Sequence, residues 1–205
     1  MNDQPVVPQT YEQWRRCIIV NCRVQLTRPY IESRLLALDW WGGNRVPFAD
    51  SGLSGLLAGL TMSTTAAGIY RALVEALCYG ARTVSELFVA GGLEVERVVL
   101  TSGLARRNRL LVQTMADVLG RAVEVPEIAN GTAVGAAIHG AVAAGLVADY
   151  AEGGDRFGAR TRERHEPRPG HAAIYERLYA GYRRLAAEQA IHQTMRELSR
   201  IDTER

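Results

Sequence analysis

Two short turns in the second half of the sequence combine small and hydroxyl-bearing residues at positions suited to ligand binding. The first turn, Ser102-Gly103-Leu104, follows a β-branched run that predicts a strand over Val98 to Thr101. An amphipathic segment that predicts a helix begins near Asn108. Open α/β folds bind ligands at the carboxyl ends of their strands, and small residues let the backbone approach a ligand closely. The first turn is therefore a candidate binding site.

The second turn, Gly131-Thr132, has the same strand-turn-helix layout. A short predicted strand, Ala122 to Val125, leads through Asn130 into a helix of small residues. The dipole and the free N–H groups at the start of a helix favour an anion there. Thr132 is expected to be the N-cap of this helix, with direct ligand contact as the alternative. The small residues that follow predict that another element packs tightly against the helix, and Gly135 is expected to serve that packing.

Asn108 could act through its side chain in two ways. An amide at a helix start caps free N–H groups, and it can also hydrogen-bond a base or a ribose. The residue by itself leaves both roles open. Its neighbours Arg106 and Arg107 could reach phosphates, but a solvated pair on a loop is the simpler interpretation.

A folded α/β domain must position these turns, and 205 residues are enough for one well-buried domain or two small ones. Apolar residues at three- and four-residue steps predict a helix from Gly68 to Ala90, which Gly91-Gly92 ends. The polar stretch from Ala151 to Gly170 predicts a surface loop. One last helix is predicted from Ala172 to Leu198.

The composition excludes several classes of protein. All 24 basic residues are arginine, and without lysine there is no Walker-type phosphate loop and no Schiff base. A net charge of +2 gives no electrostatic case for nucleic acid. The three cysteines form no paired pattern and the four histidines show no metal-ligand spacing. Because no apolar run is long enough to span a membrane or to act as a signal peptide, we expect a cytoplasmic protein with no membrane partner.

The motifs together resemble a known family. The pattern T-S-G-x-x-x-x-N-x-L-L-x-Q-x-x-A-D-x-L-G begins at Thr101, and P-E-x-x-x-x-T-A-x-G-A-A begins at Pro126. This combination is similar to the C-terminal domain of the FGGY carbohydrate kinases. Upstream, Leu35 to Arg45 and Leu53 to Thr61 look like the ribulokinase branch of that family.

The resemblance implies a fold and its boundaries. The fold class is α/β, an actin-like ATPase (ribonuclease H-like) domain with a central mixed sheet and helices on both faces. The family-like domain is expected at residues 35–198, after an irregular leader at residues 1–34 that does not match the family and before a tail at residues 199–205. The alternative for the leader is a capping segment.

The resemblance also implies an activity, which is ATP-dependent phosphorylation of a ketopentose or related sugar. The cofactors would be ATP and Mg²⁺, with the metal held through the nucleotide. The cofactor-binding residues would be Ser102, Gly103, Leu104, Asn108, Gly131 and Thr132. Ser102 replaces a glycine that is usual in the family, and its β-carbon could crowd the nucleotide.

The family's sugar site and catalytic aspartate would lie in a part that this sequence lacks. We therefore expect a truncated chain that has no catalytic residue and is inactive in isolation. Its partners would be a nucleotide and a separate N-terminal sugar-binding half. The alternative is a non-catalytic relic or oligomerisation module that associates with itself.

The ribulokinase-like signature contains two adjacent tryptophans, Trp40 and Trp41. Because exposed tryptophan is unfavourable, at least one of them should lie in the core. Asn44 and Arg45 are expected to line the cleft that faces the sugar domain. Neither Asp39 nor Asp50 is assigned as a catalytic base.

Overall fold

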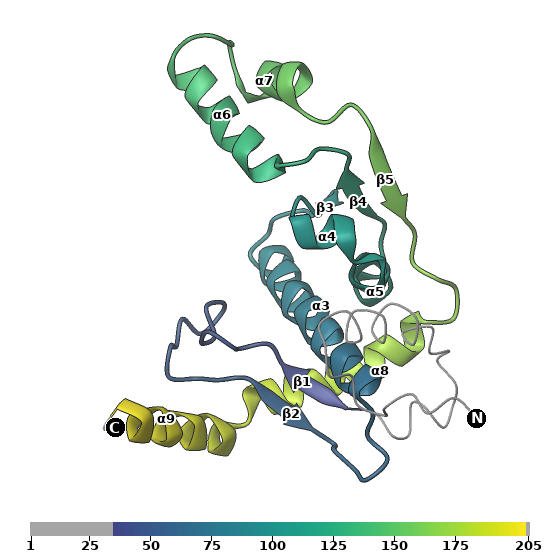
Figure 1. Cartoon of the computed structure of the whole chain (residues 1–205), viewed down its shortest axis with the longest axis vertical. Coiled ribbons are helices and arrows are strands. Elements are labelled where there is room, and N and C mark those ends of the chain that lie inside the picture. Colours follow the sequence, from purple (N-terminus) through teal and green to yellow (C-terminus); the bar gives the residue numbers. More distant parts are fainter. Residues whose placement is uncertain (1–34, 204–205) are drawn as a thin grey trace, which may run out of the picture. The chain divides into compact units, whose positions relative to one another are not determined.

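The computed structural model describes residues 35–203, so the predicted leader at residues 1–34 lies outside the described residues, as does the end of the predicted tail. The chain divides into two units (Figure 1). Unit 1 contains residues 35–80 and 178–203 of the described part, and unit 2 is Ala81–Arg177. The boundaries fall inside helices α3 (Ala66–Ala90) and α8 (Ala172–Ala187), each of which contributes residues to both units.

Unit 1 contains a two-stranded sheet packed on the first half of α3. Strands β1 (Leu36–Leu38) and β2 (Leu56–Ala58) pair antiparallel. Residues one turn apart lie on the same face of a helix, so α3 presents its small side chains together and the sheet can approach closely. The cluster is formed by Leu35, Ala37, Ala72 and Ala76, with Leu57, Ile69 and Leu73 packed against it. The helix predicted from Gly68 to Ala90 is thereby confirmed.

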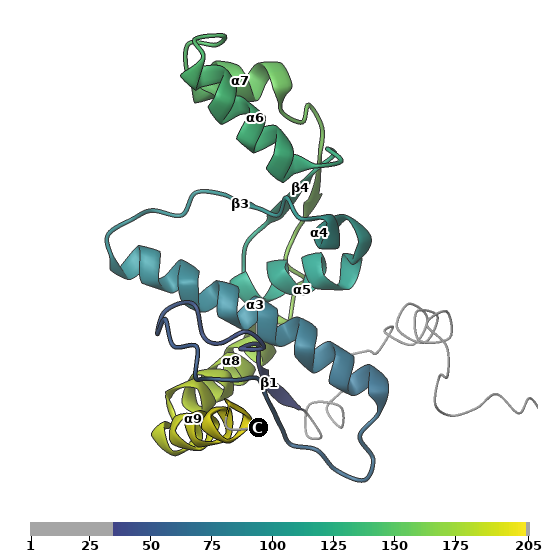
Figure 2. The ribbon, with the colours of Figure 1, turned by 60° about the vertical axis from the view of Figure 1, so that its left-hand side comes forward.

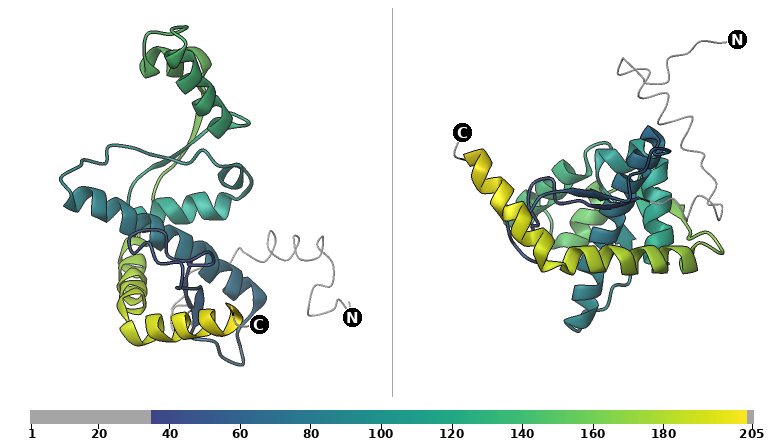
Figure 3. Two further views of the ribbon diagram at one scale, coloured as in Figure 1. Left: turned by 90° about the vertical axis from the view of Figure 1, so that its left-hand side faces the viewer. Right: turned by 90° about the horizontal axis from the view of Figure 1, so that it is seen from below.

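The single last helix predicted from Ala172 to Leu198 is wrong. Helix α8 ends at Ala187 and α9 (Gln189–Thr203) begins two residues later in a different direction (Figure 3). The buried His192 ties the two together, because its Nε2 donates to the carbonyl oxygen of Ala186 at 2.9 Å. Apolar residues continue at helical spacing on both sides of the bend, so periodicity alone did not reveal it.

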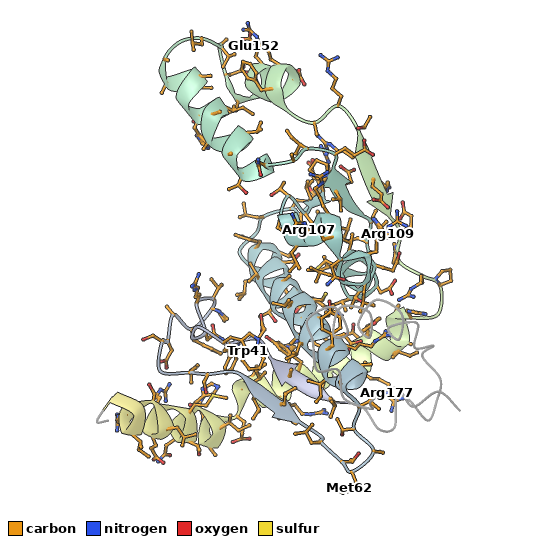
Figure 4. All side chains as sticks on the ribbon, viewed as in Figure 1. Trp41, Met62, Arg107, Arg109, Glu152 and Arg177 are labelled. Carbon is orange, nitrogen blue, oxygen red and sulfur yellow. The ribbon has the colours of Figure 1, made fainter. Side chains whose placement is uncertain are left out.

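The two tryptophans of the signature differ, as expected. Trp40 is buried, and its ring packs edge-on against His192 with ring centroids 5.5 Å apart. Trp41 is 58% exposed, just beyond the end of β1 (Figure 4). Its ring covers Gly55, where an added Cβ would overlap Trp41 Cε3. Glycine is therefore needed at position 55 for the ring to lie where it does.

Asn44 was expected to line a cleft but is buried within the loop that joins β1 and β2. Its Oδ1 accepts a hydrogen bond from the Phe48 N–H at 3.3 Å, and its backbone exchanges two hydrogen bonds with that of Asp50. The Asp50 carboxylate pairs with Arg196 of α9 at 2.7 Å, and this guanidinium lowers the pKa of Asp50. Asn44 thus holds the loop, and Asp50 fastens it to α9.

Asp39 lies partly buried beside α3 and α8. The Tyr182 hydroxyl donates to its Oδ1 at 3.1 Å. Gly80 gives the carboxylate room, since an added Cβ there would lie 2.8 Å from Asp39 Oδ2. Burial raises the pKa of Asp39 above its usual value. These contacts give the side chain a packing role within unit 1.

Unit 2 is built on a three-stranded mixed sheet. Strand β3 (Val98–Val99) lies parallel to β4 (Val123–Pro126), and β5 (Arg162–His165) lies antiparallel on the other side of β4. Helices α4 (Gly103–Arg107) and α5 (Arg109–Leu119) connect β3 to β4; α6 (Gly131–Ala143) and α7 (Tyr150–Phe157) connect β4 to β5. The mixed sheet and its helices confirm the predicted α/β class, although the described strands form two small sheets.

The prediction of a surface loop from Ala151 to Gly170 is wrong. This stretch contains most of α7 and all of β5. Asp149 caps α7, because its Oδ1 accepts the Glu152 N–H at 2.9 Å, and Glu152 in turn accepts the Ala148 N–H at 2.7 Å. Strand β5 is highly charged and is stabilised by ion pairs. Glu124 of β4, for example, lies 3.0 Å from Arg162. Because the residues of α7 and β5 are mostly polar, the sequence pattern did not predict either element.

Helix α6 was expected to be packed tightly along its small residues, and this is wrong for Gly135. No residue of α6 is buried, and among the described residues no atom outside the helix lies within 4 Å of a Cβ added at Gly135. Helix α7 lies beside α6 (Figure 2) and contacts it elsewhere. The contact is at Gly153, where an added Cβ would lie 2.6 Å from Ile138 Cγ2.

A buried carboxylate at the C-terminal end of α5 organises unit 2. Asp117 Oδ1 accepts hydrogen bonds from Gln113 Nε2 at 3.1 Å and from the Arg168 N–H at 2.8 Å. Its Oδ2 lies 2.6 Å from Arg168 Nη2 and 3.2 Å from His171 Nδ1. Gln113 and Asp117 both belong to the family-like motif. Their place in the motif is therefore explained by fastening α5 to the segment that precedes α8.

Candidate functional site

The structure brings the two predicted turns together at one edge of the sheet in unit 2. Because β3 and β4 run parallel, their carboxyl ends lie at the same edge. Gly131 packs directly on the residue before the first turn, since an added Cβ would lie 3.3 Å from Thr101 Cβ and 3.4 Å from the Thr101 carbonyl oxygen. A glycine at the start of α6 allows this approach. The two turns therefore form one continuous surface.

The first turn has an ordinary backbone conformation. Ser102 has φ −74° and ψ 151°, which any residue adopts. Its Oγ accepts the Ala105 N–H at 3.1 Å and caps the short helix α4. Gly103 has no atom within 4 Å of an added Cβ, and the Leu104 side chain is 53% exposed. The turn thus presents backbone and small side chains to solvent.

Asn108 lies between α4 and α5 and caps the second of these helices. Its Oδ1 accepts the Leu111 N–H at 3.1 Å. The capping role is therefore confirmed, whereas a nucleotide contact stays a prediction. Asn108 is also the C-cap of α4, whose N-cap is Ser102, so the two residues flank the same five-residue helix.

Thr132 was expected to be the N-cap of α6, and this is wrong. The helix begins at Gly131, its N-cap is Asn130, and the Asn130 side chain makes no capping hydrogen bond. Thr132 is exposed in the first turn of α6. The N–H groups at this helix start are thus left without a side-chain cap from position 130, which is compatible with an anionic ligand.

Arg106 and Arg107 are both exposed, as the interpretation from the sequence expects, but Arg106 also makes a hydrogen bond within unit 2. Its Nη1 donates to the Ile128 carbonyl oxygen at 3.2 Å, which connects α4 to the segment before α6. Within the described residues, the neighbouring Arg107 has no such partner. The two arginines therefore differ in structure although they are adjacent in sequence.

A cavity of about 430 Å³ lies at the opposite end of α5 and was not foreseen. Helix α5 has 11 residues, so its ends are about 16 Å apart. Arg82 forms part of the wall and bridges three elements, because it donates to Glu86, to Glu176 and to the Val118 carbonyl oxygen at 2.9, 2.7 and 3.3 Å. These bonds satisfy the guanidinium internally and indicate a structural role for Arg82.

Comparisons with known proteins agree with the motifs. Residues 23–144 match the C-terminal domain of the FGGY family of carbohydrate kinases. A ribulokinase from Halalkalibacterium halodurans is 43% identical over 155 residues, which are 74% of this chain and 28% of that protein. A ribulokinase from Mycolicibacterium smegmatis is 42% identical over 151 residues, which are 74% of this chain and 27% of that protein. The chain thus spans little more than a quarter of the length of these relatives.

Solved structures support the fold. Xylulose kinase from Rhodospirillum rubrum matches with a TM-score of 0.71 and 28% identity, over 92% of this chain and 36% of that chain. A xylulose kinase from Brucella ovis matches with a TM-score of 0.70 and 21% identity, over 89% of this chain and 38% of that chain, and shows the fold alone. The fold is that of the actin-like ATPases.

None of the helices in residues 35–203 is long and apolar enough to cross a membrane.

The family match covers more than half of the chain, and the ribulokinases named above exceed 40% identity over about three quarters of it. The chain therefore belongs to the FGGY family of carbohydrate kinases, as a ribulokinase-like C-terminal domain.

Proposed function

We propose that this chain binds ATP at the two turns of unit 2 and serves as the nucleotide-binding part of a kinase that phosphorylates a ketopentose. The observation that carries the proposal is the contact of Gly131 with Thr101, which joins the two turns into one surface. The residues proposed to bind the nucleotide are Ser102, Gly103, Leu104, Asn108, Gly131 and Thr132. The similarity to ribulokinases and to a xylulose kinase supports a sugar kinase activity.

The physical basis is the exposure of backbone groups at this edge. Gly103 leaves open space for a nucleoside to approach, and the start of α6 offers N–H groups to a phosphate. Mg²⁺ usually reaches such sites through the phosphates themselves, with few protein ligands. Phosphoryl transfer depends mainly on positioning and charge stabilisation, so a domain that fixes the nucleotide supplies one part of the catalysis.

The chain alone, incubated with ATP, Mg²⁺ and a ketopentose, is expected to transfer no phosphoryl group above background. The matched residues are only 28% of the H. halodurans ribulokinase, and we propose that a sugar site and a general base reside in the remainder of such proteins. A coupled ADP-release assay would measure this, with the H. halodurans ribulokinase as positive control. Robust turnover by the pure chain would contradict the expectation.

Substitutions of Asn108 and Ser102 should change nucleotide affinity in opposite directions. Asn108→Ala should weaken ADP binding, because a hydrogen bond is lost at a cost of about 0.5–1.5 kcal/mol. Ser102→Gly should strengthen it, because removal of the β-carbon lets the ligand approach. Ser102→Gly also loses the cap to Ala105, so its stability should fall by about 0.3 kcal/mol even as its affinity rises, because glycine is itself tolerated at an N-cap.

Calorimetric titration of the three proteins with Mg²⁺-ADP would test these signs. Thermal unfolding measured in parallel separates affinity from stability. Equal affinities, or tighter binding by Asn108→Ala, would show that the ligand does not bind at this turn.

A second candidate function is a non-catalytic interaction module. The absence of any buried residue in α6, together with the exposed Leu146 (69%) and Tyr150 (58%) beside it, favours this alternative. The partner would be a second copy of the chain or a separate sugar-binding chain. Sedimentation at several concentrations, with and without ADP, would separate self-association from nucleotide binding.

A further inference from the structure

Helix α4 is short and is attached to the rest of unit 2 by few contacts. It has five residues, and only Ala105 among them is buried. Helices of this length are not stable by themselves, so their position depends on local bonds. The described bonds of α4 outside its own backbone are the Ser102 cap at its start and the bond from Arg106 to Ile128.

The segment that receives the Arg106 bond is held on its other side by Thr161, the residue before β5. The Glu127 N–H donates to the Thr161 carbonyl oxygen at 3.0 Å, and the Thr161 hydroxyl donates to Glu127 Oε2 at 2.6 Å. Ile128 follows Glu127 directly and comes two residues before the N-cap of α6. Arg106 therefore connects α4, which makes few hydrogen bonds to the rest of unit 2, to the segment before α6, which is hydrogen-bonded to Thr161.

We propose that Arg106 is a positioning residue for the nucleotide, which sets the separation of the two turns without contacting the phosphates. This inference depends on the proposed function, because it assumes that the nucleotide occupies both turns. A guanidinium that donates to a carbonyl at 3.2 Å holds a fixed distance between two backbone segments. The binding surface formed by Ser102 on one side and Gly131 on the other is then ready before the ligand arrives.

The alternative is that Arg106 pairs directly with a phosphate. The two roles predict different effects of an Arg106 substitution on the binding of charged and uncharged ligands. A residue that sets the geometry of both turns should affect adenosine and ATP equally, whereas a phosphate ligand should affect ATP and leave adenosine unchanged. Arg107, labelled in Figure 4, supplies a matched control, because it is an exposed arginine on the same short helix. Within the described residues it has no hydrogen bond like that of Arg106.

The test compares the full chain with Arg106→Ala and Arg107→Ala in titrations with adenosine, ADP and ATP. Arg106→Ala should weaken all three by the same factor, about threefold to tenfold for one lost hydrogen bond. Arg107→Ala should leave adenosine binding unchanged. Both variants should keep the thermal midpoint of the wild type, because both side chains are exposed.

Hydrogen exchange without ligand provides a second measurement. The Ala105 amide should exchange faster in Arg106→Ala than in Arg107→Ala, because α4 has lost one of its attachments. Equal exchange and equal affinities in the two variants, with normal binding by the wild type, would overturn the positioning role alone. A loss confined to ATP and ADP would also overturn it. Failure of the wild type to bind any of the three ligands would overturn the proposed function as well.

Discussion

Replacement of Asp117 by alanine is expected to lower the free energy of unfolding by about 2–4 kcal/mol. The carboxylate is fully buried and accepts hydrogen bonds from Gln113, from the Arg168 backbone and from the Arg168 side chain, whose Nη2 lies 2.6 Å away. Its removal leaves the partly buried Arg168 N–H without its partner and releases the segment before α8. Arg168 can return to water because its side chain is 44% exposed, so we place the expected loss below that for a fully buried ion pair.

Urea unfolding of the wild type, Asp117→Ala and Asp155→Ala would measure this effect. Asp155 is an exposed aspartate on α7 of the same unit, so its removal should change stability by less than about 0.5 kcal/mol. A loss below 1 kcal/mol for Asp117→Ala would contradict the organising role assigned to the carboxylate.

Gly43→Ala is expected to be the second large perturbation, with a loss of about 2–3 kcal/mol. Gly43 has a φ of +81°, which other residues adopt only with strain. An added Cβ would also lie 2.8 Å from the Ser51 Cα, a backbone atom that cannot turn aside. Both costs fall on the loop that Asn44 and Asp50 hold in unit 1.

Gly120→Ala is the matched control, because it separates strain from steric overlap. Gly120 has a φ of +63° at the C-cap of α5, but no atom lies within 4 Å of an added Cβ. This variant should lose only the conformational part, about 1 kcal/mol. Equal losses at the two positions in thermal unfolding would show that the overlap at Gly43 is relieved by movement of the loop.

Local sequence patterns correctly predicted the elements in which apolar side chains are buried and glycines end helices. The apolar period of α3, the Gly91-Gly92 stop and the burial of at least one of the two adjacent tryptophans all follow from residue type, and all are confirmed. The two turns were recognised from small residues after β-branched runs. Their closeness could be expected because parallel strands end at a common edge, as the Gly131 contact with Thr101 bears out.

Other features depend on contacts that no local pattern specifies. Strand β5 is polar because its charged side chains pair with Glu124, a residue about 40 positions earlier. The bend after Ala187 depends on the contact of His192 with Ala186. Helix α6 begins one residue earlier than expected, with Asn130 as its N-cap, and Gly131 there packs on Thr101. The bond from Arg106 to Ile128 likewise joins residues 22 positions apart. Such pairings are decided by tertiary structure, so the sequence alone could not assign them.

Nucleotide binding at the two turns is tested most directly by hydrogen exchange of the full chain with saturating Mg²⁺-ADP. The predicted result is saturable binding with slower exchange at residues 102–108 and 128–132 of unit 2, and no change in the loop at residues 41–53 of unit 1. The contradicting result is either no saturable binding or protection confined to the cavity beside Arg82 and Glu176, which would place the ligand at the opposite end of α5.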